Sequence, residues 1–178
     1  MPLSILSDVC ERKDLSYLSG KRVAIDLSGW VVQAIQCKEL NQLKNPHLRN
    51  LFCRVSWLLL NDVHPIFVLE ALVKPKHFVL LCAKRIVDGV ITNDNDAFLY
   101  GADTVFRDFT INPKDAHVNM YSLNSTKNKL QLNQQTLIGL ALLLGCDYSK
   151  GVPGIGKEAA VKLIKELQDC DLLQRFQD

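Results

Sequence analysis

Two aspartates separated by one residue, Asp94 and Asp96, have the spacing best suited to chemistry in this sequence. They follow residues 89–92, a short apolar run that predicts a buried β-strand, and they precede the apolar stretch 97–100. In open α/β sheets, ligands bind beyond the carboxyl ends of the strands. Two carboxylates so close together repel each other unless a cation neutralises them, and Mg²⁺ prefers such oxygen ligands. The spacing therefore predicts a magnesium site.

The same residues also fit a simpler interpretation. Asp and Asn are the residues that most often cap helices and form turns. Residues 93–96 could therefore be only the capped start of a helix. From this stretch alone, the two interpretations are equally good.

Three further carboxylates follow apolar stretches in a similar way. Asp26 lies near the end of the apolar run 23–27, Glu70 ends residues 65–70, and Asp147 follows an apolar helical pattern over residues 134–144. Helix, strand and acid in repetition are typical of the βαβ units of a parallel sheet. Because an unpaired buried carboxylate is costly, Asp26 needs a partner or a metal ion. We expect the acids to converge at one rim of the sheet.

The elements that must position these acids are predicted from apolar periodicity. Asn45 and Pro46 predict the start of a helix to about residue 61, with an apolar stripe in the core and with Arg49 and Arg54 on a solvated face. Residues 104–106 and 118–121 predict a hairpin-like edge of the sheet. Further helices are predicted at residues 30–40, in the crossover 71–86, and at 123–132, 134–144 and 158–167.

A glycine-rich turn precedes the last predicted helix. Glycines before a helix expose backbone N–H groups where the helix dipole favours anions, which predicts a phosphate-binding turn. A nucleotide-binding P-loop requires Ser or Thr after the lysine. Here Glu158 takes that position and no buried strand precedes the turn, so an ATPase is disfavoured. The residues of the turn are Gly151, Gly154, Ile155, Gly156 and Lys157.

The composition is that of one soluble globular chain. The 178 residues are 48% hydrophobic and 22% charged, with a net charge of +2, so any phosphate-binding surface must be a local patch. The first residues contain charges and no long apolar run, which predicts an intracellular protein. The 6 cysteines form no Cys-x-x-Cys pair and the 4 histidines show no ligand spacing, which favours reduced thiols over a zinc site.

Six sequence blocks together resemble one family. The blocks AIDLSGW, NPHLRNLFCR, FVLE, ITNDNDAFLYGA, LLLGCDY and GVPGIGKEAA are similar, in order, to the structure-specific nucleases related to flap endonuclease and XPG, and most closely to GEN-type Holliday junction resolvases. The resemblance implies a PIN-like parallel sheet flanked by helices, followed by a helix-two-turn-helix element that grips duplex DNA. It implies phosphodiester hydrolysis with two Mg²⁺ ions. The carboxylates that match the family's metal site are Asp26, Glu70, Asp94, Asp96 and Asp147.

The resemblance also implies partners and boundaries. The turn Gly151, Gly154, Ile155, Gly156 and Lys157 matches the duplex-gripping element, which often binds K⁺ in the family. Branched DNA is the implied partner, with a dimer on four-way junctions and a location in the nucleus. We expect a PIN-like core over residues 1–132 and a helix-two-turn-helix element over residues 133–178.

The sequence departs from the family pattern in three places. Pro2 stands where the family has glycine, and no helical arch or Gly-Glu-Ala-Glu-Ala block lies between Glu70 and residue 87. With no glutamate between Glu70 and Asp94, two metal ligands of the family are missing, so the five acids could hold one Mg²⁺ and should bind a second only weakly. The sequence also ends soon after the glycine turn, where family enzymes continue. We interpret it as a shortened form of a GEN-type nuclease.

Two other functions fit parts of the sequence. A non-catalytic DNA-binding module would use the turn from Gly154 to Lys157 and the basic stretch 74–85, although lysines there could also be ordinary solvated charges. A PIN-like ribonuclease is disfavoured, because a small RNase needs no duplex-gripping turn.

Overall fold

A computed structural model describes residues 5–36, 44–69, 81–82, 84–146 and 149–167 of the chain. The predictions for Pro2, Glu70 and Asp147 therefore lie outside the described residues. Most of the stretch 71–86 also lies outside them. No helix among the described residues is long and apolar enough to cross a membrane.

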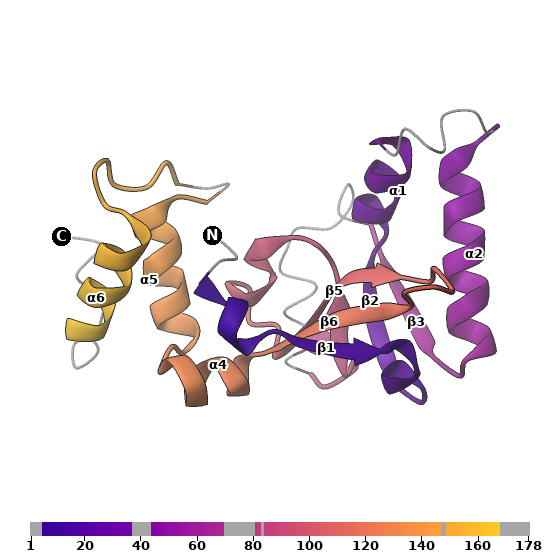
Figure 1. The fold of residues 1–178 in the computed structure, drawn as a ribbon, viewed down its shortest axis with the longest axis horizontal. Helices are drawn as coiled ribbons and strands as arrows, with labels where there is room; N and C mark the ends of the chain where they lie inside the picture. The colour runs from indigo at the N-terminus through magenta and orange to yellow at the C-terminus, as the bar shows by residue number, and fades with distance from the viewer. Residues whose placement is uncertain (1–4, 37–43, 70–80, 83, 147–148, 168–178) are drawn as a thin grey trace.

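One six-stranded sheet forms the centre of the fold (Figure 1), with strand order β1-β6-β5-β4-β2-β3. Four neighbouring strands run parallel, as predicted: β3 (His64–Val68), β2 (Arg22–Asp26), β4 (Gly89–Ile91) and β5 (Thr104–Thr110). β6 (His117–Ser122) pairs antiparallel with β5, so the predicted hairpin is confirmed. The hairpin is not the edge of the sheet, because β1 (Glu11–Asp14) pairs antiparallel with β6 on its outer side.

Two apolar clusters cover the two faces of this sheet. On one face, helices α1 (Leu27–Gln36) and α2 (Pro46–Leu60) contribute Trp30 and Leu58 to a cluster that contains Ile25 of β2 and Phe106 of β5. On the other face, Ala24, Val90 and Val105 belong to a cluster that also contains Phe98 of the 3-10 helix Asn95–Phe98 and Leu137 and Leu140 of helix α5 (Gln134–Leu144). Burial of apolar residues on both faces is typical of parallel strands.

Three helices follow the sheet in sequence. Helix α4 (Leu123–Leu130) leads from β6 to α5, and α6 (Lys157–Glu166) packs beside α5 through Ala160 and Ile164. These helices agree with the predictions within one or two residues at each end. Helix α1 begins at Leu27, three residues earlier than predicted, and its predicted end lies outside the described residues.

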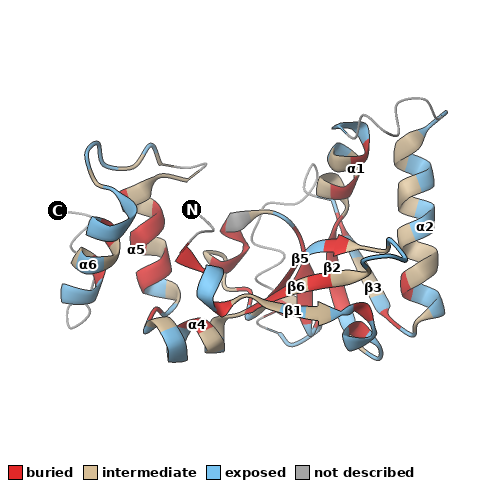
Figure 2. Ribbon diagram, in the orientation of Figure 1, coloured by how far each residue is buried: buried red, intermediate tan, exposed pale blue. Residues whose placement is uncertain are grey.

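The apolar stripe of α2 was predicted to be core, and this prediction is wrong for most of its length. Asn45 does precede the helix, with a left-handed φ of 55°, and Pro46 is its first residue. Leu58 is fully buried, but Leu48, Phe52 and Leu59 are 55%, 71% and 61% exposed. Figure 2 shows α2 mostly in the colours of exposed and intermediate residues. Among the described residues, α2 packs mainly against helix α1 and strand β3, so only part of its apolar stripe is covered there.

Strand β3 is last in the order of described strands. The N–H of His64 donates to the carbonyl of Lys21 at 2.9 Å, and N–H groups alternate in direction along a strand. The backbone nitrogen of Pro65 therefore points away from β2, on the outer side of the sheet. Proline has no N–H to donate, so no ladder hydrogen bond is lost there.

Candidate metal centre and glycine turn

Three residues from three parallel strands form a row at the carboxyl edge of the sheet. Ile25 pairs with Ile91, Ile91 pairs with Phe106, and the N–H of Thr92 donates to the carbonyl of Phe106 at 3.1 Å. The next residues along these strands are Asp26, Thr92 and Arg107, and all three are buried. Because side chains alternate along a strand, the row lies on the face of Ala24, Val90 and Val105.

Asp26 is held at this edge by two hydrogen bonds. Its Oδ2 accepts from the Thr92 hydroxyl at 3.0 Å, and its Oδ1 accepts from the backbone N–H of Gly29 at 2.8 Å. A Cβ on Gly29 would lie 2.6 Å from Oδ2 of Asp26, so only glycine fits there without a shift. The start of α1 therefore closes on the carboxylate.

The hydroxyl of Thr92 connects Asp26 to the acidic loop. While it donates to Asp26, it accepts from the backbone N–H of Asp94 at 3.0 Å. Asp94 in turn caps the 3-10 helix Asn95–Phe98, since its Oδ1 accepts from the N–H of Asp96 at 2.9 Å. The capping interpretation of this stretch is thus confirmed.

The predicted site residues come together in part. Asp26, Asp94 and Asp96 lie along one rim, joined through Thr92, and Asp26 and Asp96 are only 6% and 3% exposed. Glu70 and Asp147 lie outside the described residues. Within the described ranges, no three His, Cys, Asp or Glu side chains are grouped closely enough to hold a metal ion. The metal site therefore stays a prediction.

Arg54 also lies in this region. The prediction that Arg54 lies on a solvated face is wrong. Its guanidinium lies 4.8 Å from the ring centroid of Trp30, and its Nη1 donates to Gln33 at 3.5 Å. Burial lowers the pKa of Arg54. It lines a narrow pocket together with Asp26 and other site residues. Periodicity along α2 gave no sign of this, because the contact depends on the crossing of α1 and α2.

Arg107 is a second cation that the sequence reasoning missed. It is 8% exposed, and burial lowers its pKa while Asp108, Tyr121 and Asp94 attract its charge and raise it. A signal was present: Arg107 follows the apolar pair 105–106, as Asp26 follows residues 23–25. A lone arginine is so often a surface residue that this signal is weak.

The glycine turn lies between α5 and α6, as predicted. Gly151 and Gly154 have left-handed φ angles of 74° and 84°, and the N–H of Val152 donates to the carbonyl of Leu143 at 2.8 Å. A Cβ on Gly151 would lie 2.7 Å from the backbone nitrogen of Gly145, so the turn packs tightly against the end of α5. The turn is therefore anchored on one side.

The other side of the turn is open. Gly154, Gly156 and Lys157 are exposed, Ile155 is partly buried, and a Cβ on Gly154 or Gly156 would meet nothing within 4 Å. Gly156 is the residue before α6 and supplies no side chain to cap it. The first N–H groups of a helix have no partner within the helix and favour anions.

An acidic rim on a mixed α/β sheet, followed by a helix pair joined through a glycine turn, is the architecture of a nuclease core. Residues 3–77 match the XPG N-terminal domain, and residues 76–147 match the XPG I-region. The chain belongs to the XPG family.

Relatives and solved structures agree with this assignment. Flap endonuclease GEN homolog 1 of Mus musculus is 40% identical over 230 residues, which cover 97% of this chain and 25% of the relative. Human GEN1 in a crystal structure with Holliday junction DNA is 39% identical with a TM-score of 0.86, covering 98% of this chain and 56% of that one. A eukaryotic junction-resolving enzyme, GEN-1 binding with potassium, is 24% identical with a TM-score of 0.74 over 92% of this chain and 49% of that one, which shows the fold alone.

The chain thus spans a quarter of the length of the mouse relative. The aligned 230 residues also exceed the 178 residues of the chain, so the relative contains residues within the aligned region that have no counterpart here.

Proposed function

We propose that this chain is a metal-dependent, structure-specific DNA endonuclease of the GEN type, which acts on branched DNA in repair and recombination. One observation supports this most directly: the hydrogen-bonded series Asp26, Thr92, Asp94 and Asp96 at the carboxyl edge of the parallel strands. The identity to flap endonuclease GEN homolog 1, and to human GEN1 solved with Holliday junction DNA, supports the proposed substrate class, a Holliday junction or a 5′-flap.

The residues present fit a hard divalent cation by their chemistry. Asp26 and Asp96 are buried carboxylates, and buried carboxylates are normally paired or bind a metal. Mg²⁺, when bound, activates water and stabilises the leaving oxygen of a phosphodiester. In this proposal Asp26, Asp94 and Asp96 hold one Mg²⁺, with Glu70 and Asp147 as further ligands by their match to the family. Thr92 fixes Asp26 and the acidic loop relative to each other.

The glycine turn is proposed to bind the DNA duplex. Gly151, Gly154, Ile155, Gly156 and Lys157 lead into the start of α6, where a helix N-terminus favours a phosphate and where carbonyl oxygens can hold a K⁺ ion. Residues 133–178 form this element and residues 1–132 the nuclease core. A dimer on four-way junctions and a location in the nucleus complete the proposal.

The proposed core is internally shortened after Glu70. Two findings support this: the aligned length exceeds that of the chain, and the matches to the two XPG regions meet at residues 76–77. Loss of the arch and of two glutamates leaves fewer oxygen ligands, so a second Mg²⁺ is expected to bind weakly if at all.

Incision of labelled DNA tests the proposal. Purified protein is incubated with Mg²⁺ and a four-way junction, a 5′-flap or single-stranded RNA, and the products are separated on a denaturing gel. We expect cuts in branched DNA that Asp94→Ala abolishes. Asp88→Ala is the matched control, because Asp88 lies just before β4, at the opposite end of the same strand, and pairs with Arg22. Cleavage of RNA alone would instead identify a PIN-like ribonuclease.

A DNA-binding module without catalysis is the second candidate. It is favoured by the lack, among described residues, of a group of three metal-ligating side chains. It predicts binding to branched DNA that weakens steeply with salt, no incision, and no rise of the thermal midpoint with millimolar Mg²⁺. A midpoint that rises with Mg²⁺ in the parent chain but not in Asp94→Ala would favour the nuclease.

A further inference from the structure

Arg107 stands in the row of site residues but has no role in the metal chemistry proposed above. It lies next to Thr92 on the neighbouring strand, on the side opposite Asp26, because Ile91 pairs with Phe106 one residue earlier. Asp26, Thr92 and Arg107 thus place an acid, a hydroxyl and a guanidinium side by side at the edge of the sheet.

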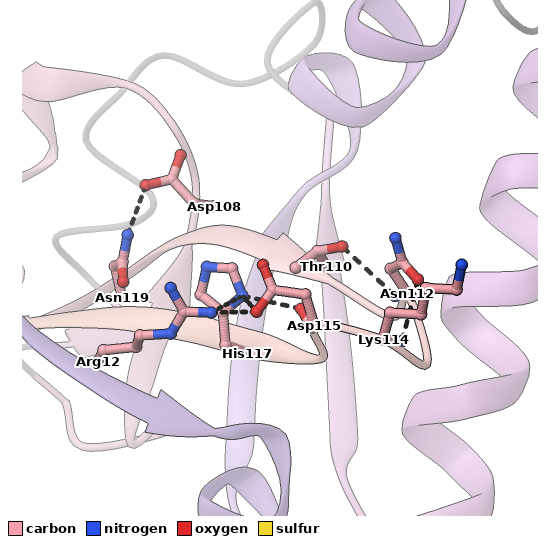
Figure 3. A network of polar contacts seen from close by, with 8 residues as sticks. All are labelled: Arg12, Asp108, Thr110, Asn112, Lys114, Asp115, His117 and Asn119. Carbon is pink, nitrogen blue, oxygen red and sulfur yellow. Dashed lines mark hydrogen bonds and ion pairs between the residues drawn. The ribbon is translucent and has the colours of Figure 1, made fainter.

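The backbone immediately after Arg107 is fixed by side chains from two directions. Asp108 has a left-handed φ of 53° at an irregularity in the pairing of β5 with β6. Its N–H donates to Oδ1 of Asn93 at 3.0 Å. Its Oδ2 accepts from Nδ2 of Asn119 at 2.8 Å, and Figure 3 draws this second bond. Such bulges beside a site typically re-aim a side chain. The direction of Arg107 is therefore tied to the acidic loop through Asn93.

The guanidinium of Arg107 lacks the partners that a buried charge needs. The residue is more than nine-tenths buried, and within the described part of the chain its Nε and Nη1 make no hydrogen bond. No carboxylate among the described residues forms an ion pair with it, although Asp108 and Asp94 attract it from farther away. A buried cation without a paired anion costs free energy. An anion that binds beside it offsets this cost, so the site favours anion binding.

We propose that Arg107 binds a phosphate oxygen of the nucleic-acid backbone beside the acidic rim. This deepens the proposed function and rests on the chain being a DNA-binding protein of this family. The guanidinium fork matches the geometry of phosphate, and its Nε and Nη1 have no hydrogen-bond partner among the described residues.

A scan with methylphosphonate DNA tests this contact. Four-way junctions each carry one neutral methylphosphonate, placed in turn at the phosphates around the branch point. Affinity is measured by fluorescence anisotropy with Ca²⁺, on DNA that a gel shows to be uncut. At one position the parent chain should lose about tenfold in affinity, the loss expected for one charge-assisted contact. At that position Arg107→Met should lose nothing further, because the contact is already missing.

Arg107→Lys keeps the charge but not the fork, and should lose an intermediate amount at the same position. Equal losses in the parent chain and Arg107→Met at every position would overturn the proposal, as would a scan without any sensitive position. If Arg107→Met does not fold, as judged by its thermal midpoint, the comparison between parent and Arg107→Lys decides in the same way. The scan needs no incision, so a chain that never cuts DNA would refute the nuclease activity and leave the result for Arg107 readable.

Discussion

The hydroxyl of Thr92 offers a direct test of the hydrogen-bonded rim. Thr92→Val keeps the shape of this buried side chain and removes the atom that donates to Asp26 and accepts from Asp94. The lost bond to a charged acceptor costs about 2 kcal/mol, and the partly buried N–H of Asp94 left without its acceptor costs about 1 kcal/mol more. The free energy of unfolding should therefore fall by about 3 kcal/mol.

Urea unfolding in EDTA, followed by the fluorescence of Trp30 and Trp57, measures this change. A loss of about 3 kcal/mol corresponds to a thermal midpoint lower by roughly 6–12 °C for a chain of this size. Thr126→Val is the matched control, since Thr126 is fully buried and its hydroxyl makes one neutral hydrogen bond, to the carbonyl of Ser122 at 2.9 Å. It should cost only about 1 kcal/mol.

The comparison can refute the reasoning in either of two ways. If Thr92→Val costs no more than Thr126→Val, the hydroxyl does not link Asp26 to the acidic loop. If the loss is large but the response of the midpoint to Mg²⁺ is unchanged, the link contributes to the fold and not to a metal site.

Three further predictions follow from the close packing and burial of single residues. Gly29→Ala should push Asp26 from its position, lowering the free energy of unfolding by about 2 kcal/mol in urea and reducing any midpoint rise with Mg²⁺. Gly151→Ala should lower the thermal midpoint and the affinity for duplex DNA, because the added Cβ would meet backbone atoms and the φ of residue 151 is 74°. Gly156→Ala is the control: its added Cβ would meet nothing within 4 Å, so the midpoint should not change. Burial, with a smaller contribution from Cys10, raises the pKa of Tyr121 to about 12. This pKa lies above the value of about 10 for tyrosine in an unfolded chain, so the free energy of unfolding should fall as pH rises from about 10 to about 12. Tyr121→Phe should remove that fall, and with it the tyrosinate absorbance change that occurs at the highest pH.

The strands that carry the acids could be predicted from sequence because their signals are local. Residues 23–25 and 89–91 are short apolar runs buried on both faces, and each is followed within a few residues by an acid. The signal for the glycine turn was also local, since Gly151 and Gly154 adopt the left-handed φ angles that glycine tolerates best.

Features that depend on contacts between distant residues could not be predicted. The hydrogen bond from Thr92 to Asp26 joins residues 66 positions apart and exists only in the observed register. The same holds for Arg54 over Trp30. Strand β1 was missed because its sequence, Glu-Arg-Lys-Asp, has no apolar alternation, and pairing with β6 decides its conformation.

The proline in β3 has a consequence for how the molecule behaves at high concentration. A long strand at the end of a sheet is normally a template for a strand from a second molecule, which leads to aggregation. Pro65 removes one donor from the outward-facing row, and Pro in such a position is a recognised means of protection. The chain should therefore remain dispersed, and Pro65→Val should make it precipitate sooner without weakening the monomer.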